Sequence, residues 1–274
     1  MKPAPFDYVR AESVEAAIGL VDGHSGFAKF IAGGQSLGPM LNLRITQPDL
    51  LVDISHVDAL TAVDAGGEAL VLGGGTLHAD VEDGIVPDVA NGMLQYVAAG
   101  ISYRAVRNRG TLGGSLAHAD PAADWPVTMM ALGAEIDVRG IGGKRTIAAV
   151  DLIDGPLMTC LTDDEIVEQV RVPKLSKAAT WGYHKLCRKV GEFGHSLAAV
   201  VIDRDRGYAR AVLGCATTPP MVLVHTSGVL VDGGGGDLGA AIEQDLGASE
   251  FPFDDYELQV HRTLVQRAGR DALA

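Results

Sequence analysis

Two short glycine-rich segments most constrain what this chain can fold into: Ala32–Ser36, with the sequence AGGQS, and Thr111–Ser115, with the sequence TLGGS. Glycine has no Cβ, so nearby backbone amides can approach a ligand closely and a positive φ costs little. Each segment ends in a hydroxyl residue and precedes an apolar stretch that is expected to be helical. Amides that converge at a turn before a helix form a nest for an anion, most often a phosphate. The two segments therefore predict a ligand with two phosphates, held from both sides.

The composition narrows the class of protein. The chain has 274 residues, enough for one large domain or two ordinary ones. Asp and Glu number 35 against 22 Lys and Arg, which gives a net charge of −13. This acidity argues against binding to nucleic acid, which needs a basic surface. The sequence has neither an apolar run of about 18 residues nor an apolar leader at its start. We therefore expect a cytoplasmic protein without a membrane span.

The cysteines and histidines give no sign of a metal site. Cys160, Cys187 and Cys215 are far apart and form no CxxC pattern, and the eight histidines are not grouped at the spacing of metal ligands. We expect no zinc or iron–sulfur site within this chain. The cysteines are expected to be buried thiols in a reducing compartment.

Other nucleotide and catalytic motifs can be set aside. The Walker pattern GxxxxGK[ST] is absent, and GxGxxG occurs only within the polar glycine run at 234–239, which does not directly follow an expected strand as the Rossmann motif requires. Gly34–Gly38, with the sequence GQSLG, fits the nucleophile elbow GxSxG of esterases. However, that elbow follows a central strand, and only about 35 residues precede Ser36, too few to build the sheet around it. An esterase would also leave the second glycine segment unexplained.

The expected elements mix strands and helices without regular βαβ alternation, which favours an α+β fold over a doubly wound sheet. Strands are expected at 29–32, 50–54, 165–172, 181–188, 196–202 and 208–216, hairpins at 60–72 and 135–148, and helices near 13–21, 76–83, 88–98, 121–132, 237–246 and 254–269. The composition changes at Pro173–Lys177, so we place a domain boundary at about residue 175.

Longer runs around the glycine pairs carry a family resemblance. The first combines Ala32–Leu37 (AGGQSL), Pro39–Arg44 (PMLNLR) and Val52–Ile54 (VDI), and the second is Val106–Pro121 (VRNRGTLGGSLAHADP). Together they resemble the FAD-binding medium subunit of molybdenum hydroxylases, in the carbon monoxide dehydrogenase and xanthine dehydrogenase family. The resemblance implies a vanillyl-alcohol-oxidase-type FAD-binding domain at 1–175, with lobes at about 1–55 and 56–175. A small α+β C-terminal domain at 176–274 completes the implied fold.

The resemblance also implies which residues contact FAD: Ala32, Gly33, Gly34, Gln35, Ser36, Leu37, Thr111, Gly113, Gly114, Ser115, Asp124, Val167, Lys185 and Phe193. The two glycine segments match the loops on either side of the FAD diphosphate. Asp124 matches an acidic position that contacts the cofactor, and Val167 an apolar position near the flavin or the adenine. Lys185 matches a lysine near the flavin ring, where a cation would stabilise negative charge on the reduced flavin. Phe193 is expected to stack on the ring.

Several of these residues also have a purely structural interpretation. Asp124 is equally an acid that caps or solvates the 121–132 helix, and Lys185 is equally a surface lysine. Three arginines, Arg104, Arg107 and Arg109, either form a solvated face or reach the diphosphate or a partner subunit.

By resemblance, the expected function is electron transfer within a complex. A small partner subunit would carry two [2Fe–2S] clusters and a large one molybdopterin, assembled as a dimer of heterotrimers. Substrate would be oxidised at molybdenum, and electrons would pass through the clusters to FAD in this chain and then to an external acceptor. The alternative is a self-contained flavin-dependent oxidase or dehydrogenase, because the same FAD fold supports both.

Overall fold

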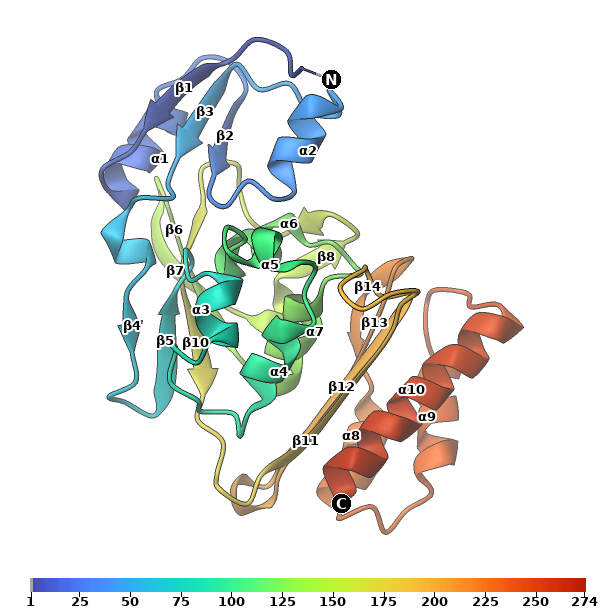
Figure 1. Cartoon of the computed structure of the whole chain (residues 1–274). Coiled ribbons are helices and arrows are strands. Elements are labelled where there is room, and N and C mark those ends of the chain that lie inside the picture. Colours follow the sequence, from blue (N-terminus) through green and yellow to red (C-terminus); the bar gives the residue numbers. More distant parts are fainter. Residues whose placement is uncertain (1) are drawn as a thin grey trace.

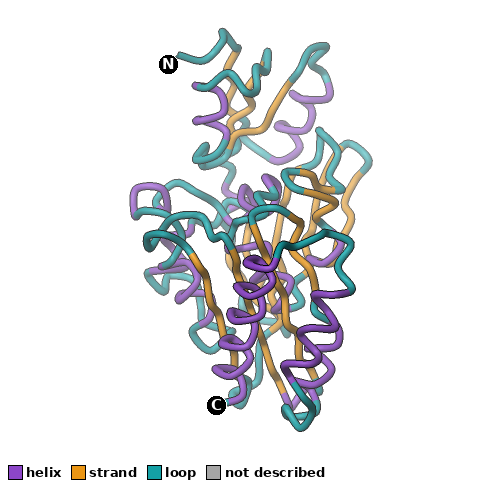
Figure 2. Tube along the Cα trace, turned by 90° about the vertical axis from the view of Figure 1, so that its right-hand side faces the viewer, coloured by secondary structure: helices purple, strands orange, loops and turns teal. Residues whose placement is uncertain are grey.

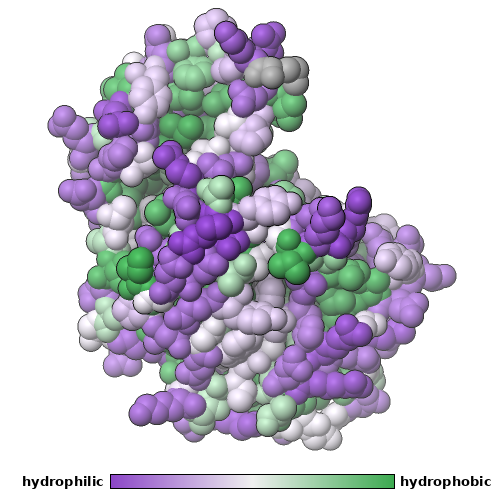
Figure 3. All heavy atoms as spheres, in the orientation of Figure 1, coloured by the Kyte–Doolittle hydropathy of each residue, from purple (hydrophilic) through white to green (hydrophobic). Residues whose placement is uncertain are grey.

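Three main sheets follow one another along the chain in the computed structural model, which describes residues 2–274 (Figure 1). We call the regions around them the first lobe (2–55), the second lobe (56–175) and the C-terminal region (176–274). The first lobe lies at one end of the molecule, and the other two regions pack against each other below it (Figure 2). Hydrophilic side chains cover much of the face seen in Figure 3.

The first lobe is a small parallel sheet with two helices. Its strands are β1 (Asp7–Arg10), β2 (Ala28–Ile31) and β3 (Leu50–Asp53), in the order β1-β3-β2. Helix α1 (Val14–Asp22) begins after Ser13, whose hydroxyl accepts a hydrogen bond from the first turn. Helix α2 (Leu37–Asn42) directly follows the first glycine segment. The apolar core of this lobe extends to Leu60 and Ile166 of the second lobe, so the two lobes share buried surface.

The second lobe is an antiparallel sheet covered by short helices. Its strands are β4 (Val63–Asp64), β5 (Ala69–Gly73), β6 (Glu135–Gly140), β7 (Gly143–Ala148) and β10 (Ile166–Pro173), in the order β4-β5-β10-β6-β7. Its helices are α3 (His78–Glu82), α4 (Met93–Ala99), α5 (Arg104–Arg107), α6 (Leu112–His118) and α7 (Asp124–Leu132). A two-stranded ribbon consists of β8 (Ile153–Gly155) and β9 (Met158–Thr159), and short 3₁₀ turns cover Asp58–Leu60 and Ala149–Asp151.

The C-terminal region is an antiparallel sheet with strands in chain order and three helices. The strands are β11 (Thr180–Leu186), β12 (Ser196–Asp203), β13 (Tyr208–Cys215) and β14 (Thr218–Val222), with a 3₁₀ turn at Arg204–Arg206, and the helices are α8 (Val224–Val231), α9 (Leu238–Gly247) and α10 (Asp255–Leu273). Side chains alternate between the two faces of a strand. Accordingly, Leu197 and Ala199 of β12 belong to the core of the second lobe, whereas Ala198 and Val200 pack in a separate core with α10.

Helix α7 lies between the second lobe and the C-terminal sheet, and all nine of its residues are buried. The core therefore continues across the boundary that we place at about residue 175. Methionine, valine and leucine around the whole circumference of α7 suit a helix that contacts protein on every side.

The α+β class is confirmed, and most expected elements are present with shifted ends. The 76–83 and 88–98 helices are shorter than expected, at His78–Glu82 and Met93–Ala99, whereas the last helix continues to Leu273. The strand expected at 60–64 is a 3₁₀ turn followed by the two-residue β4. Strands β1 and β14 and helix α8 were not anticipated.

Candidate functional site

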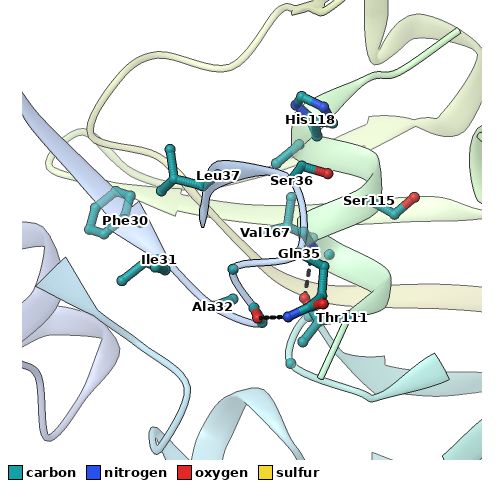
Figure 4. A pocket seen from close by; sticks show the side chains of 18 of the residues that line it. Phe30, Ile31, Ala32, Gln35, Ser36, Leu37, Thr111, Ser115, His118 and Val167 are labelled. Carbon is teal, nitrogen blue, oxygen red and sulfur yellow. Dashed lines mark hydrogen bonds between the residues drawn. The ribbon is translucent and has the colours of Figure 1, made fainter. Parts of the chain in front are cut away.

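A cleft of about 860 Å³ separates the first lobe from the second (Figure 4). This volume is within the range of roughly 300–1,000 Å³ that is typical of cofactor and ligand sites. The cleft is lined by residues 29–37 of the first lobe, by residues 108–118 around the start of α6, and by residues 157–167 before and within β10. Phe193, in the loop between β11 and β12, completes the lining from the C-terminal region. Thirteen of the fourteen residues that the resemblance assigns to FAD line this cleft, and Lys185 does not.

The first glycine segment presents free backbone donors. Gly34 has φ of +69°, a left-handed conformation that glycine adopts without strain. Within residues 2–274, the N–H groups of residues 33 to 37 donate to no protein acceptor. The side chain of Gln35 folds back and donates from Nε2 to the carbonyl oxygen of Gly33 at 2.9 Å, which fixes the turn (Figure 4). This segment has the properties of an anion nest.

The second glycine segment differs from the expectation, because its glycine pair lies in the first turn of α6 rather than in a loop. Thr111 is the N-cap, and its Oγ1 accepts from the Gly114 amide at 3.1 Å. The Leu112 and Gly113 amides donate to the carbonyl oxygens of Thr76 at 2.9 Å and Gly74 at 2.8 Å. The expectation of free amides is therefore wrong for these three residues, and this side of the cleft offers the hydroxyl groups of Thr111 and Ser115 instead.

The floor of the cleft is built from closely packed backbone. A Cβ on Gly33 would be 1.9 Å from the carbonyl oxygen of Arg109, and one on Gly113 would be 2.6 Å from that of Gly74. A Cβ on Gly74 would in turn be 2.0 Å from the carbonyl oxygen of Val167. The glycines thus allow the first segment, α6 and β10 to contact one another through main chain. The run Gly73–Gly75 is visible in the sequence, but sequence reasoning missed its role in the site.

Asp124 brings a buried acid to the cleft from the first turn of α7. Only 6 % of the residue is exposed, so the alternative that it merely solvates the helix is wrong. Instead, Oδ1 accepts hydrogen bonds from the Tyr183 hydroxyl at 2.6 Å and from Lys185 Nζ at 2.7 Å. Burial raises the pKa of Asp124, and these two donors oppose that rise.

Lys185 is not among the residues that line the cleft, and its Nζ also donates to the carbonyl oxygen of Gly100 at 3.0 Å. The alternative of a surface lysine is wrong, since 9 % of its side chain is exposed. Val167 is buried in β10 at the cleft wall, whereas Phe193 is 65 % exposed at the rim. No sequence signal pointed to Tyr183 as the second partner of Asp124.

The three arginines have different roles. Arg107 is buried, and it donates to Glu82 at 2.7 and 2.8 Å and to the carbonyl oxygens of Ile101 and Ser102. Arg104 is half exposed and binds Glu82 as well as Asp83. The solvated face is therefore wrong for Arg107. Arg109 is exposed, lines the cleft and has no carboxylate within 4.0 Å in the described chain.

A buried histidine, His78, packs against the segment that leads into α6. His78 Nδ1 accepts a hydrogen bond from Trp125 Nε1 at 3.0 Å. Burial lowers the pKa of His78 to about 4, so the ring is neutral near pH 7. The imidazole is close to Gly110, where a Cβ would be 2.7 Å from Nε2. His78 therefore holds the approach to α6 through packing rather than charge.

Ion pairs also connect the two lobes beside the cleft. Arg139 of β6 contacts Glu15 of α1 and binds Glu168 of β10 at 2.9 Å. Lys29 of β2 is 3.6 Å from Asp163. Most of these groups are exposed, so we expect each inter-lobe pair to contribute less than about 1 kcal/mol.

Two further properties of the described chain bear on its class. Within residues 2–274, no helix has the length and apolar character needed to cross a membrane. The same residues contain no group of three or more His, Cys, Asp or Glu side chains placed to hold a metal ion.

Comparison with known proteins identifies the family. The family described as "FAD binding domain in molybdopterin dehydrogenase" matches residues 4–175. The chain is 34 % identical over 285 residues to the 6-hydroxypseudooxynicotine dehydrogenase complex subunit alpha of Paenarthrobacter nicotinovorans, an alignment that covers 100 % of this chain and 96 % of the relative. It is 35 % identical over 205 residues to the carbon monoxide dehydrogenase medium chain of Hydrogenophaga pseudoflava, with coverage of 75 % and 71 %.

Solved structures agree with the sequence comparison. A structure of carbon monoxide dehydrogenase from Hydrogenophaga pseudoflava, which lacks the Mo-pyranopterin moiety of its cofactor, superposes with a TM-score of 0.91 at 30 % identity, covering 99 % of this chain and 98 % of that one. Quinoline 2-oxidoreductase from Pseudomonas putida 86 superposes with a TM-score of 0.86 at 28 % identity, covering 100 % of both chains. The chain therefore belongs to the family of FAD-binding medium subunits of the molybdenum hydroxylases, which are oxidoreductases.

Proposed function

We propose that this chain binds FAD in the cleft between its lobes and transfers electrons within a molybdopterin-containing hydroxylase or dehydrogenase complex. It would receive electrons from a [2Fe–2S] cluster of a small partner subunit and pass them to an external acceptor. A large partner subunit would hold the molybdopterin and the substrate. In this proposal, residues 1–175 form the FAD-binding domain, in two lobes divided near residue 55, and residues 176–274 form the C-terminal flavoprotein domain.

The observation that carries the proposal is the set of unpaired amides at residues 33 to 37. Buried or half-buried N–H groups are normally paired, so a run of free donors in a cleft calls for an anionic ligand. The FAD diphosphate carries two negative charges and suits such a nest. The nest forms only because Gly33 has no Cβ and because Gly34 adopts a left-handed conformation. The residues present therefore fit FAD.

The remaining assigned residues would hold the cofactor by contact along the cleft. Ala32 and Leu37 flank the amide nest, and Thr111 and Ser115 offer hydroxyl donors from the opposite side. Val167 offers an apolar wall, and Phe193 an exposed aromatic ring at the rim. FAD, when bound, supplies a carrier that exchanges electrons between a one-electron cluster and a second acceptor. The task of the chain is to orient that carrier, to bury it on one side and to leave an edge near the rim.

The first test is the visible spectrum of the purified chain after incubation with FAD and desalting. Near-stoichiometric absorption of oxidised flavin is expected. If the isolated chain retains none, the same measurement on the chain co-purified with subunits encoded beside it decides the matter, and a colourless complex would refute the FAD site.

A second test separates electron transfer within a complex from a self-contained oxidase. In the first case, bound flavin is reduced rapidly only after a partner that contains iron–sulfur clusters has been added and reduced. Reduction of the isolated flavoprotein by an organic substrate alone would favour the self-contained enzyme.

A further inference from the structure

The Asp124–Lys185 pair connects the cofactor cleft to the C-terminal sheet. Asp124 lines the cleft, whereas Lys185 does not. Their charged atoms are 2.7 Å apart, and less than a tenth of each side chain is exposed. The two are 61 positions apart along the chain, so the contact depends on how α7 is placed against the C-terminal sheet that contains β11. Within residues 2–274, Lys185 Nζ is bound to Asp124 and to the carbonyl oxygen of Gly100, so its link to the cleft runs through Asp124.

The carboxylate uses its two oxygens differently. Both protein donors, the Tyr183 hydroxyl and Lys185 Nζ, bind Oδ1. No hydrogen bond within residues 2–274 uses Oδ2, and this atom is not among the fully enclosed polar atoms that lack a partner. Oδ2 is thus a free acceptor on a residue that lines the cleft. An ionised carboxylate oxygen forms strong, short hydrogen bonds with N–H and O–H donors.

We propose that Lys185 is a positioning residue that acts on the cofactor through Asp124, holding the carboxylate ionised and turned so that Oδ2 accepts a hydrogen bond from an N–H or O–H group of FAD. This inference rests on the proposed FAD function. It replaces the expectation that Lys185 itself stabilises charge on the flavin. Tyr183 assists by occupying Oδ1 from the same strand.

The electrostatics of the site give the reason for a lysine at this position. A buried carboxylate without a counter-charge takes up a proton, and a protonated carboxyl group is a poorer acceptor. Burial already raises the pKa of Asp124, and Lys185 is the strongest influence that lowers it. Other titratable groups near the network are Tyr96, which packs against Tyr183, and Cys187, whose charge would also act on that phenol. On the cleft side, His118 and Asp120 line the same space.

A double-mutant cycle on FAD binding tests the proposal. The dissociation constant of FAD is measured by titration between pH 6 and 9 for the wild type, Lys185→Met, Asp124→Asn and the double variant. Lys185→Arg is included because it keeps the charge and the donors. Lys177→Met serves as a matched control, since Lys177 is an exposed lysine outside the cleft. Thermal melting by circular dichroism records whether each variant folds.

The expected result has three parts. Lys185→Met weakens FAD binding at neutral pH, and affinity recovers with rising pH by at most tenfold per unit, because the carboxyl group must lose its proton before it can accept. Lys185→Arg and the control bind like the wild type. In the Asp124→Asn background, Lys185→Met causes no further loss beyond about twofold, since the two residues act through one contact.

An equal loss from Lys185→Met in both backgrounds would show that the lysine contacts FAD directly and would overturn the proposal. A loss that does not change with pH would do the same. If Lys185→Met does not fold, Lys185→Gln keeps a donor for Oδ1 without a charge and replaces it in the cycle. Failure of the wild type to bind FAD would instead refute the proposed function, so the two failures are distinguishable.

Discussion

Replacing Gly33 by alanine is expected to damage the cleft more than any other single-methyl change in the first segment. The new Cβ would be 1.9 Å from the carbonyl oxygen of Arg109 and 2.9 Å from Cα of Gly110. Real Cβ contacts are essentially never shorter than 3.0 Å, so the two segments must separate by at least about 1.1 Å. Both obstacles are backbone atoms and cannot rotate away. Overpacking of this kind costs about 1–3 kcal/mol.

Because both segments line the cleft, this strain is expected to appear in FAD affinity as well as in stability. A loss of 1–3 kcal/mol corresponds to roughly 5- to 150-fold weaker binding. The assay is titration of the purified variant with FAD, followed by flavin fluorescence, alongside thermal unfolding by circular dichroism. Each kcal/mol of destabilisation should lower the melting temperature by about 2–4 °C in a chain of this size.

Gly38→Ala is the matched control. It adds the same methyl group five residues later, inside α2, where no atom is within 4 Å of the new Cβ. Alanine in a helix is favoured over glycine by about 0.5–1 kcal/mol, so this variant should melt at the same temperature or higher and bind FAD like the wild type. The reasoning fails if Gly33→Ala folds and binds FAD within about twofold of the wild type, or if Gly38→Ala weakens binding as much.

Three further predictions concern neighbouring residues. The pKa of His78 is lowered to about 4 from an ordinary 6.5, so between these pH values the unfolded chain binds a proton that the folded chain does not. The free energy of unfolding should therefore fall by up to about 1.4 kcal/mol per pH unit as the pH drops from 6.5 to 4. His78→Gln should reduce this pH dependence, as measured by urea titrations at several pH values. Arg107→Met should lower the free energy of unfolding by about 3 kcal/mol, because it removes both bonds to Glu82, which keeps only Arg104, and leaves two partly buried carbonyls unpaired. The half-exposed Arg104→Met should cost clearly less, and similar losses would contradict the assigned burial. Gly114→Ala should weaken FAD binding less than Gly33→Ala does. The nearest atom to the new Cβ at Gly114 is the Thr111 hydroxyl oxygen at 2.7 Å, and a side chain can rotate whereas a backbone carbonyl cannot. A larger loss of FAD affinity in Gly114→Ala than in Gly33→Ala would contradict the inference that backbone forms the floor of the cleft.

Local signals predicted much of the fold. The last helix carries an N-cap at Asp254 with Glu257 three residues later, and the structure has the complete capping box. By contrast, β14 was missed because its run TPPMV contains two prolines, which a strand tolerates only at a sheet edge. Strand β1 is short and wholly exposed, and it exists through parallel pairing with a strand more than forty residues away. Composition alone could not reveal such a partner.

For the candidate site, too, local sequence patterns predicted some features, whereas others depend on contacts between distant segments. The glycine pairs are visible in the sequence because only glycine allows the close backbone contacts at Gly33 and Gly113. Which amides remain free was not predictable, since the amides of Leu112 and Gly113 donate to the carbonyl oxygens of Thr76 and Gly74, in and just after a separate glycine cluster. The partner of Lys185 was equally hidden, because the contact depends on how α7 is placed against the C-terminal sheet.

The main-chain floor of the cleft has a consequence for how this protein can change. A surface made of peptide groups has no rotamers to order, so the shape offered to a ligand is nearly independent of the side chains above it. Substitutions along the walls, such as at Ser115 or Phe193, can then retune affinity or access without rebuilding the base. The glycines beneath are the opposite case, since even one methyl group at Gly74 would meet a carbonyl oxygen at 2.0 Å. Libraries that aim to alter the cofactor or the acceptor should therefore vary the walls and keep the base intact.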